Sequence, residues 1–267
     1  MKRRLSIGYA CLNETLKKKG IFTNRTMRKK TFKLRGIEYV SELSLQNVKD
    51  LKTIVQWNNK MNIKLFRLSS QIFPWSDEYN IKDLKDYDEI SKLMLEVGKI
   101  ALDGGQRLTM HPGPYNCLAS PTQKVVEKTI RELNFHSKQF DMMGYPPSQY
   151  NKINIHVGGF YGDKEATLIR FCQNFELLGE NTKKRLVIEN DDSANEFSVK
   201  DLYEGVYKSV GMPITFDYFH HKFNTGGLSE EEALKLASKT WPEGITQCCH
   251  YSESRRKEQL DEKIKPT

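Results

Sequence analysis

Five apolar runs in this sequence each lead into side chains that can bind a metal ion. These side chains are imidazoles and carboxylates, and they stand at His111 in RLTMHPG, His156 in KINIHVGG, Glu189 in RLVIEND, Asp217 and His220 in PITFDYFHH, and His250 in ITQCCHYS. Both groups suit divalent zinc, manganese and iron, whereas thiolates would favour zinc or copper. A cluster of this composition is typical of a hydrolytic site in which metal ions activate water and stabilise both oxygens of a phosphate displacement. The pattern therefore predicts one shared metal site, with Glu189, Asp217 and His250 as its catalytic residues.

The residues next to these side chains favour metal binding over simple packing. A Pro-Gly pair forces a turn directly after His111, and two glycines after His156 let a ligand come close. Glu189 follows Leu-Val-Ile, where its charge would be uncompensated unless a metal or a basic group held it. By contrast, His136 lies in the middle of a predicted helix, and we expect it to have a structural role.

The elements that must position these side chains alternate between strands and helices. Apolar runs predict strands near 5–11, 63–70, 106–111, 152–157, 185–190, 212–218 and 244–252. Helical spacing and capping signals predict helices near 44–60, 87–103, 121–143 and 163–178, from 198 onward, and near 229–239. Unbroken apolar runs are typical of parallel strands buried on both faces, and the catalytic groups of a (β/α) barrel lie where its strands end. The sequence thus predicts an α/β fold, a TIM-type barrel.

The barrel is expected to be incomplete. Seven strands can be assigned, whereas a closed barrel of this type needs eight. The final stretch, 252–267, is charged and has no apolar run, so we expect it to be disordered or the remnant of a truncated segment. The eighth strand is then absent or irregular. Because no linker divides the sequence, we expect residues 1–267 to form a single domain.

The chain is basic, and part of its charge is concentrated. It has 267 residues, with 42 Lys and Arg against 34 Asp and Glu, a formal net charge of +8. Positive charge favours a polyanionic partner, because contacts with phosphates release counterions, although a solvated basic surface would give the same composition. The stretch 17–35 includes Arg25, Arg28 and Lys29 and is dense in Lys and Arg. These residues are the best candidates for phosphate contact.

Several functional classes lack their signature. No apolar stretch is long enough to span a membrane, and the short apolar run near the N-terminus indicates a first strand rather than a signal peptide. The five cysteines form no CxxC pair, which indicates free thiols in a reducing, intracellular compartment and not a secreted protein. No GxGxxG, P-loop or GxSxG motif occurs, so neither a nucleotide cofactor nor a nucleophilic serine is expected.

Eight motifs together resemble the UV damage endonucleases. They are GYACLN at 8–13, TNRTMRKKTF at 23–32, FRLSSQIFP at 66–74, MHPGPY at 110–115, IHVGG at 155–159, VIEND at 187–191, FDYFHH at 216–221 and HYS at 250–252. Each motif is weak alone, but their order and spacing are similar across nearly the whole chain. The resemblance implies a xylose-isomerase-like TIM barrel related to metal-dependent apurinic endonucleases. It also implies hydrolysis of DNA directly 5′ to cyclobutane dimers and 6-4 photoproducts, and at some abasic sites, leaving a 3′-hydroxyl.

The resemblance also assigns roles to residues. It implies two or three divalent metal sites, with Mn²⁺ prominent and Zn²⁺, Mg²⁺ or Co²⁺ as alternatives, and the six imidazoles and carboxylates named above fall on family metal positions. Tyr9, Asn13 and Tyr115 fall on positions that hold or replace damaged bases. An aromatic ring can stack into the gap left by flipped nucleotides, which makes this use physically sensible. The expected partner is damaged double-stranded DNA, bound by a monomer.

The chain departs from the family pattern at several positions. Gln71 stands where the family usually has a histidine, Pro114 replaces a glutamine, and Cys248 replaces a lysine that is carboxylated in some members. A further histidine and a final glutamate of the family have no match before Thr267. These differences leave a second hypothesis open, a catalytically weakened homologue that binds damaged DNA. A third is a metal-dependent sugar-phosphate isomerase of the same barrel type, although the basic stretch argues against a small substrate.

Overall fold

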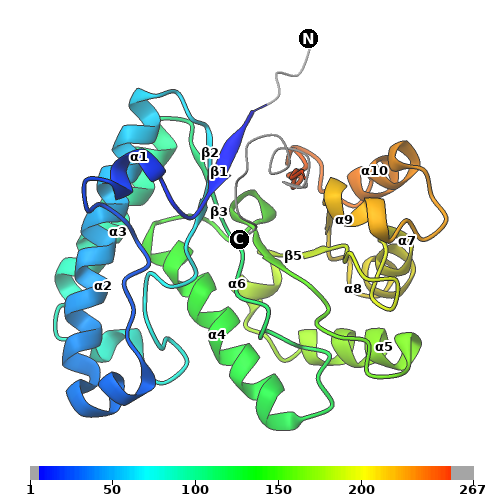
Figure 1. The fold of residues 1–267 in the computed structure, drawn as a ribbon, viewed down its shortest axis with the longest axis horizontal. Helices are drawn as coiled ribbons and strands as arrows, with labels where there is room; N and C mark the ends of the chain where they lie inside the picture. The colour runs from blue at the N-terminus through cyan, green and yellow to red at the C-terminus, as the bar shows by residue number, and fades with distance from the viewer. Residues whose placement is uncertain (1–5, 254–267) are drawn as a thin grey trace, which may run out of the picture.

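The computed structural model of the protein describes residues 6–253. Six parallel strands lie side by side in sequence order at its centre (Figure 1). They are β1 (Gly8–Ala10), β2 (Leu65–Leu68), β3 (Arg107–Met110), β4 (Ile153–Ile155), β5 (Leu186–Glu189) and β6 (Ile214–Thr215). Each strand pairs in parallel with the next, and a helical connection links every consecutive pair. This is the layout of a TIM-type (β/α) barrel.

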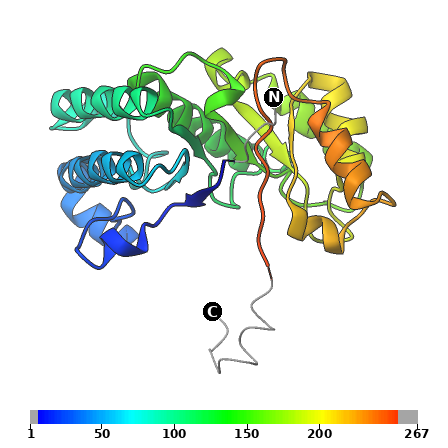
Figure 2. The ribbon, with the colours of Figure 1, turned by 90° about the horizontal axis from the view of Figure 1, so that it is seen from above.

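The helices differ in length between the two halves of the chain. The connections before β4 contain α1 (Glu14–Lys17), α2 (Lys29–Lys60), a 3₁₀ turn (Ile81–Asp83), α3 (Tyr87–Asp103), α4 (Gln123–Met142) and a second 3₁₀ turn (Gln149–Asn151). The later part contains α5 (Lys164–Phe175), α6 (Glu180–Lys183), α7 (Val199–Leu202), a π-helix (Tyr203–Tyr207), α8 (Lys208–Val210), α9 (Tyr218–Phe223) and α10 (Glu230–Ser238). In Figures 1 and 2, α2 and α3 flank one end of the sheet, and α7 to α10 flank the other.

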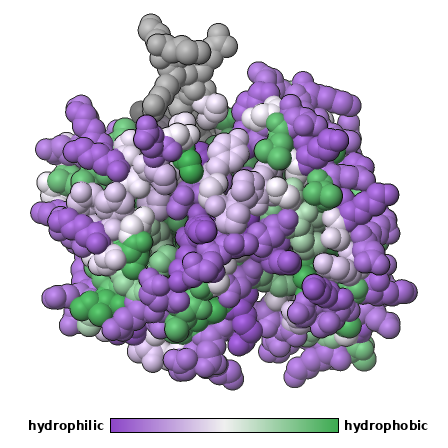
Figure 3. Space-filling model, turned by 180° about the vertical axis from the view of Figure 1, so that it is seen from behind, coloured by the Kyte–Doolittle hydropathy of each residue, from purple (hydrophilic) through white to green (hydrophobic). Residues whose placement is uncertain are grey.

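The core lies between the strands and the inward faces of the helices. In α3, Ile90, Met94, Val97 and Ala101 recur at helical spacing and are all buried. This helix packs against α2, α4 and β3, and burying each large aliphatic side chain stabilises the fold by about 1.5–3 kcal/mol. On the face shown in Figure 3, hydrophilic side chains dominate and the apolar areas are small and separate. Within residues 6–253, no helix has both the length and the apolar character needed to cross a bilayer.

The helix predictions are confirmed where the apolar spacing is regular. The predicted helix 87–103 coincides with α3, and α4 lies within the predicted range 121–143. Ser229 and Glu232 form the expected capping box at the start of α10. Regular spacing and a helix cap depend only on nearby residues, so they can be recognised without knowing the rest of the fold.

The helix expected near 44–60 is longer than predicted, because α2 already begins at Lys29, within the basic stretch 17–35. Lys and Arg are good helix formers, so the end of the basic stretch continues into the helix. A kink at Gly36, where φ is 64°, separates this first part from the amphipathic part of α2. Glycine adopts such a left-handed conformation at little cost.

The predicted seventh strand, 244–252, is reduced to a single bridge. His250 pairs in parallel with Asp217: the His250 N–H donates to the Phe216 carbonyl at 2.9 Å, and the His250 carbonyl accepts from the Tyr218 N–H at 3.1 Å. The segment leaves a Pro-Glu-Gly turn and comes into register at this one residue, so no ladder forms. The bridge still brings His250 beside the ends of β5 and β6.

The barrel is open on one side because the predicted seventh strand is reduced to this single bridge. Among residues 6–253, no strand pairs with the outer edge of β1. Most of the final stretch 252–267, for which we expected disorder or a truncated remnant, lies outside the described residues. The barrel therefore has six strands and one bridging residue in the part of the chain that the structure describes.

Candidate metal centre

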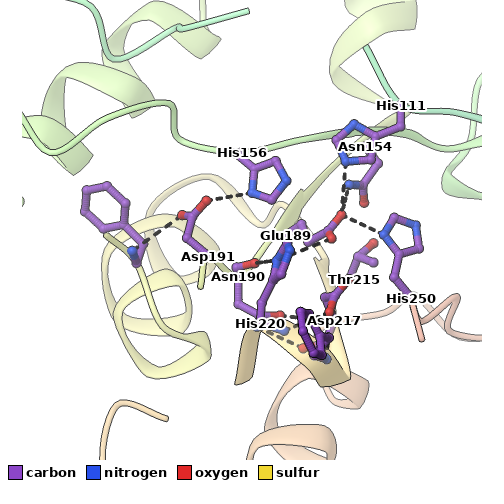
Figure 4. Close-up of polar contacts among 12 residues, drawn as sticks. His111, Asn154, His156, Glu189, Asn190, Asp191, Thr215, Asp217, His220 and His250 are labelled. Atoms are coloured by element: carbon purple, nitrogen blue, oxygen red, sulfur yellow. Dashed lines mark hydrogen bonds and ion pairs between the residues drawn. The ribbon is translucent and has the colours of Figure 1, made fainter. Parts of the chain in front are cut away.

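Glu189 lies at the centre of the strand ends. It is the last residue of β5 and is 1% exposed. Its Oε2 atom lies 3.3 Å from His111 Nε2 and 2.8 Å from His250 Nδ1, and its Oε1 atom lies 3.7 Å from His220 Nδ1 (Figure 4). A buried carboxylate needs such partners or a cation. The expected convergence of side chains from distant segments on Glu189 is therefore present.

Two groups of candidate metal ligands share this carboxylate. In each group, one ligand atom from every residue lies within 4.8 Å of the others. The first group is His111, Glu189 and His250, and the second group is His156, Glu189 and His220. The rings of neighbouring histidines lie 5.3 to 5.7 Å apart between centroids. A carboxylate between two sets of imidazoles has the donor chemistry for two divalent cations.

Hydrogen bonds to protein oxygens fix which nitrogen most of the histidines present. His111 Nδ1 lies 3.0 Å from the carbonyl oxygen of the next residue, and His220 Nδ1 lies 2.8 Å from the Asn190 carbonyl oxygen. A carbonyl oxygen can only accept, so both Nδ1 atoms donate and both Nε2 lone pairs stay free. His156 Nδ1 lies 2.7 Å from Asp191 Oδ1. Metal-binding imidazoles commonly have such a partner, which holds the ring.

Asp217 lies beside the cluster but belongs to neither group. Its Oδ1 atom caps α9 by accepting from Phe219 N at 2.8 Å and His220 N at 2.9 Å. The Asn190 side chain hydrogen-bonds both the N–H and the carbonyl of Asp217. A carboxylate is a favoured N-cap, so α9 starts directly after it. This helix was not expected from the sequence, and it places His220 beside Glu189.

The cluster changes the charge of its members. Burial raises the pKa of Glu189, but the nearby imidazoles, His250 and His111 foremost, outweigh burial and hold that pKa well below its usual range. Burial and the Lys152 ammonium lower the pKa of His250 to about 4, against the opposing effect of Glu189. Burial also lowers the pKa of His111. At neutral pH the first group therefore combines an ionised carboxylate with neutral imidazoles, which are the forms that bind cations.

His156 behaves differently from the other histidines. Burial lowers its pKa, but the hydrogen bond to Asp191 and the charge of Glu189 raise it to about 9. The ring is therefore an imidazolium at neutral pH unless a cation takes the place of its proton. Burial and the neighbouring Asp191 also raise the pKa of Glu196. Three acidic side chains, Asp191, Asp192 and Glu196, thus lie on the side of the second group.

A cavity of about 630 Å³ lies in front of the cluster. Tyr9 and Arg67 line one wall, and the segment 248–252 lines the other. The cavity thus follows the open side of the barrel. Within residues 6–253, the buried Nε of Arg67 has no hydrogen-bond partner. A guanidinium beside a cluster of candidate metal ligands suits an anionic group such as a phosphate.

Tyr9 and Asn13 form one unit at the wall of this cavity. The Tyr9 hydroxyl donates to Asn58 Oδ1 at 2.7 Å and accepts from Asn13 Nδ2 at 2.8 Å. Asn13 is buried and caps α1 by accepting from Leu16 N at 3.0 Å. The Tyr9 ring packs on Phe66, with 4.9 Å between the ring centroids. These contacts hold an aromatic ring in a fixed position.

Tyr115 lies on the loop after β3 and is 87% exposed. The next residue, Asn116, is buried and anchors this loop, donating to the Gly113 carbonyl at 3.1 Å and to Glu132 Oε1 on α4 at 3.0 Å. An exposed ring on an anchored loop can stack on a base with little loss of conformational freedom.

The three basic residues expected to contact DNA differ in their surroundings. Arg28 and Lys29 are exposed at the start of α2. Arg25 instead pairs with Asp50 at 2.8 Å and donates to two backbone carbonyls of its own loop. The Arg25 guanidinium is therefore engaged within the fold, whereas the other two side chains face solvent.

Five polar residues of the site were given no role from the sequence. They are Arg67, Lys152, Asn154, Asn190 and Asp191. The sequence does mark two of them. Lys152 begins the apolar run KINIHV and Asn154 interrupts it, so each is a polar residue in a run that predicts a buried strand. A polar side chain in a strand buried on both faces needs a partner inside the barrel.

The remaining residues singled out from the sequence lie outside both groups. His136 is buried in α4, where Gln139 hydrogen-bonds its Nδ1 atom. Gln71 and Pro114 are exposed, and Cys248 is buried and lines the cavity. Gln71 and Cys248 therefore supply no ligand to the two groups.

Comparison with known proteins agrees with this architecture. The family model described as UV-endonuclease UvdE matches residues 5–265. The chain is 38% identical over 263 residues to the UV-damage endonuclease of Schizosaccharomyces pombe, covering 93% of this chain and 42% of that protein. It is 32% identical over 252 residues to the UV DNA damage endonuclease of Clostridium perfringens, covering 93% of this chain and 58% of that protein. The chain thus spans about half the length of these two relatives.

The solved structures support the same conclusion. The crystal structure of SacUVDE superposes with a TM-score of 0.84 and 34% identity, covering 95% of this chain and 82% of that one. The D-psicose 3-epimerase of Clostridium cellulolyticum H10 has a TM-score of 0.56 and 14% identity, covering 77% of this chain and 68% of that one. The second likeness shows the barrel fold alone. With a family match over nearly all of its length and a closely superposing structure, the chain belongs to the UV-endonuclease UvdE family.

Proposed function

We propose that the protein is a DNA repair endonuclease that needs divalent metal ions and cuts the strand 5′ to UV photoproducts. The observation that carries this proposal is the buried Glu189 carboxylate between two sets of histidines, in front of a cavity, in a chain of this family. The substrates are cyclobutane dimers, 6-4 photoproducts and some abasic sites, as the resemblance implies. The protein acts as a monomer inside the cell.

The donor set fits a pair of divalent cations. The first and second groups would each hold one ion, with Mn²⁺ as the leading candidate and Zn²⁺, Mg²⁺ or Co²⁺ as alternatives. Divalent ions at such a site polarise the phosphate and help to form the attacking nucleophile. Glu189 orients both groups, and Asp217 holds His220 in place through the cap of α9. Asp217 also lines the cavity and is available as a further ligand.

Different residues hold the DNA. Arg28 and Lys29 bind the phosphate backbone, while Arg25 shapes the loop that precedes them. Tyr9 and Asn13 form the wall against which the damaged nucleotides rest. Tyr115 enters the distorted stack, where damaged bases cost less to extrude. Specificity then depends chiefly on the deformability of the lesion site and less on base edges.

A cleavage assay tests the proposal directly. The protein is incubated with Mn²⁺ and an oligonucleotide duplex that carries one cyclobutane dimer, and the products are separated by size. We expect a single cut on the 5′ side of the dimer, no cut in the undamaged duplex, and loss of cutting in the presence of a chelator. No 5′ cut above the undamaged background would refute the proposal.

A second candidate function is a homologue that binds damaged DNA but cuts it poorly. It is favoured by Gln71, which is exposed and stands outside both groups where the family usually has a histidine, and by Cys248 in place of a lysine. Metal analysis separates the two candidates. Two tightly bound ions favour the nuclease, whereas fewer than two ions together with retained lesion binding favour the binder.

A further inference from the structure

Lys152 occupies a position where a lysine is costly. It directly precedes β4 and is 1% exposed. Its Nζ atom lies 2.9 Å from Asn154 Oδ1, 2.9 Å from Thr215 Oγ1 and 3.2 Å from His250 Nε2. A buried ammonium is unfavourable unless its partners compensate for the lost water. Three polar atoms around the three N–H donors of Lys152 meet that requirement.

Arg185 shows how a buried cation serves the fold elsewhere in this protein. It directly precedes β5 and is fully buried, as Lys152 is before β4. The Arg185 guanidinium pairs with the Asp141 carboxylate at 2.8 Å and bonds nearby hydroxyl and carbonyl oxygens. Among residues 6–253, Lys152 has no carboxylate oxygen within 4.0 Å of its ammonium. Its partners are uncharged and lead to the metal centre instead.

Asn154 connects Lys152 to Glu189. An amide has one accepting and one donating end. Because the Lys152 ammonium occupies Oδ1, the Nδ2 end of Asn154 faces Glu189 Oε2 and donates to it. If the amide rotated, two oxygens would face each other. The fixed amide therefore holds Oε2 in the first group and leaves Oε1 to the second group.

His250 is held from the same ammonium. His250 Nε2 lies 3.2 Å from Lys152 Nζ, within hydrogen-bond distance, so this edge of the ring is held by the lysine. The opposite edge of the ring, with Nδ1, is then turned toward Glu189 Oε2 at 2.8 Å. Two of the three residues in the first group thus take their orientation from contacts that begin at Lys152.

We propose that Lys152 is a positioning residue of the metal centre, which sets the ligand geometry of the first group through Asn154 and His250. The inference rests on the proposed function, because it concerns how the chain holds metal. In the part of the chain that the structure describes, neither His156 nor His220 hydrogen-bonds the Lys152 ammonium. The Mn²⁺ affinity of the second group therefore serves as the internal reference, because loss of Lys152 should not change it.

Manganese titration of the purified protein tests this role without any cleavage assay. Calorimetry and the electron paramagnetic resonance of free Mn²⁺ count the bound ions and give their affinities. Lys152→Met keeps much of the side-chain volume and removes the charge. We expect it to weaken one of the two ions by about 10–100-fold, the usual effect of losing a residue that orients a ligand. The other ion should keep its affinity.

Two further variants make the test specific. Asn154→Ala should weaken the same ion as Lys152→Met, and the double variant should be little worse than the stronger single variant, because both changes act along one path. Arg185→Met is the matched control. It removes a buried cation from the equivalent place before the next strand, so it should lower the thermal unfolding temperature but leave both ions bound.

The outcomes are distinguishable. If a folded Lys152→Met variant binds both ions as the wild type does, the inference is overturned while the proposed function stands. If Lys152→Met does not fold, Asn154→Ala decides, and wild-type Mn²⁺ binding by that variant overturns the inference. If the wild type binds no Mn²⁺ at all, the proposed function and the inference fail together.

Discussion

The part of the barrel before β4 and the part from β4 onward are built differently. The earlier strands are linked by the long helices α2, α3 and α4, whereas the later strands are followed mainly by short helices and one π-helix. Five of the six expected metal ligands lie in the later part, and only His111 lies in the earlier part. The residues expected to contact DNA, from Tyr9 to Tyr115, all lie in the earlier part.

One barrel can in this way divide two tasks between its two parts. Long amphipathic helices bury their apolar faces over many residues and form a rigid support for exposed side chains such as Tyr115 and Lys29. Short helices leave more of the chain in loops, and loops at strand ends bring polar groups to one site. Asp217 is an example of such a loop residue. It lies two residues after β6 and caps the short helix α9 that follows directly. Substitutions in the two parts should therefore change different measurements.

The largest expected effect is that of Glu189→Gln. Loss of the charge between the two groups should reduce the single-turnover rate of incision by about 10³-fold or more, since several kcal/mol of transition-state stabilisation depend on the metal ions. Binding of damaged DNA, measured by gel shift in the presence of Ca²⁺, should stay close to that of the wild type. The exposed Glu176→Gln serves as the control. If Glu189→Gln cut DNA as fast as the wild type, the cluster in the later part of the barrel would not take part in the cleavage reaction.

The second expected effect is on stability and depends on pH. In chelator-treated protein, His156→Gln removes the imidazolium that pairs with Asp191 at 2.7 Å. The folded pKa of His156 is raised to about 9, above the unfolded value of 6.5. Its contribution to the free energy of unfolding is therefore fully present below pH 6.5 and is lost as the pH rises through about 9.

Urea unfolding of wild type and His156→Gln from pH 6 to pH 10 measures this contribution. The difference between the two proteins should be about 1–3 kcal/mol at pH 6, given about 1.4 kcal/mol per pKa unit, and should shrink toward pH 10. A difference that is constant over this range would mean that the ring only packs. Thr53→Ser on the exposed side of α2 is a control for which no pH dependence is expected.

Much of the architecture and most of the cluster could be predicted from the sequence. The signal in α3 is local, because Ile90, Met94 and Val97 recur on one face. The signal at His111 is local as well, because a Pro-Gly pair marks the end of its strand. Parallel strands that end in a common layer then bring such residues together without further information.

The parts that could not be predicted depend on contacts between distant residues. The start of α9 requires Asn190 to hold Asp217 from a position 27 residues earlier in the chain. The placement of the Lys152 ammonium depends on Thr215 and His250, which lie 63 and 98 residues further along. The single bridge at His250 likewise forms only after β6 is in place. No local pattern reports these pairings.

The third expected effect concerns lesion recognition in the earlier part. Tyr115→Ala removes an exposed ring from the anchored loop after β3. Stacking of a base on an aromatic ring contributes about 1–3 kcal/mol, so the preference for damaged over undamaged duplex should fall by about 5–100-fold, while Mn²⁺ affinity stays unchanged. Tyr150→Ala is the control, because Tyr150 lies before β4, at the opposite end of the strands. Equal lesion preference in Tyr115→Ala and wild type would argue against a role for this ring.

The smallest expected effect is that of the exposed cations. Arg28→Ala and Lys29→Ala should each weaken binding of damaged and undamaged duplex alike. Each should also reduce the slope of log affinity against log salt by about 0.9, the value for one lost phosphate contact. Fluorescence anisotropy at several salt concentrations measures the slope. Lys208→Ala, on α8 in the later part, removes an exposed cation that pairs with Glu204 and should leave the slope unchanged.

Arg25 differs from Arg28 and Lys29 because its guanidinium is engaged within the fold. Its guanidinium is 2.8 Å from Asp50 and donates to carbonyls of its own loop, so Arg25→Ala should lower the free energy of unfolding and change the salt slope less than Arg28→Ala does. Removing one partner leaves the buried Asp50 carboxylate without its cation, which is costly. If Arg25→Ala instead reduces the slope as much as the exposed cations do and leaves stability unchanged, the guanidinium reorients toward DNA on binding, and the whole basic stretch acts as one phosphate-binding surface.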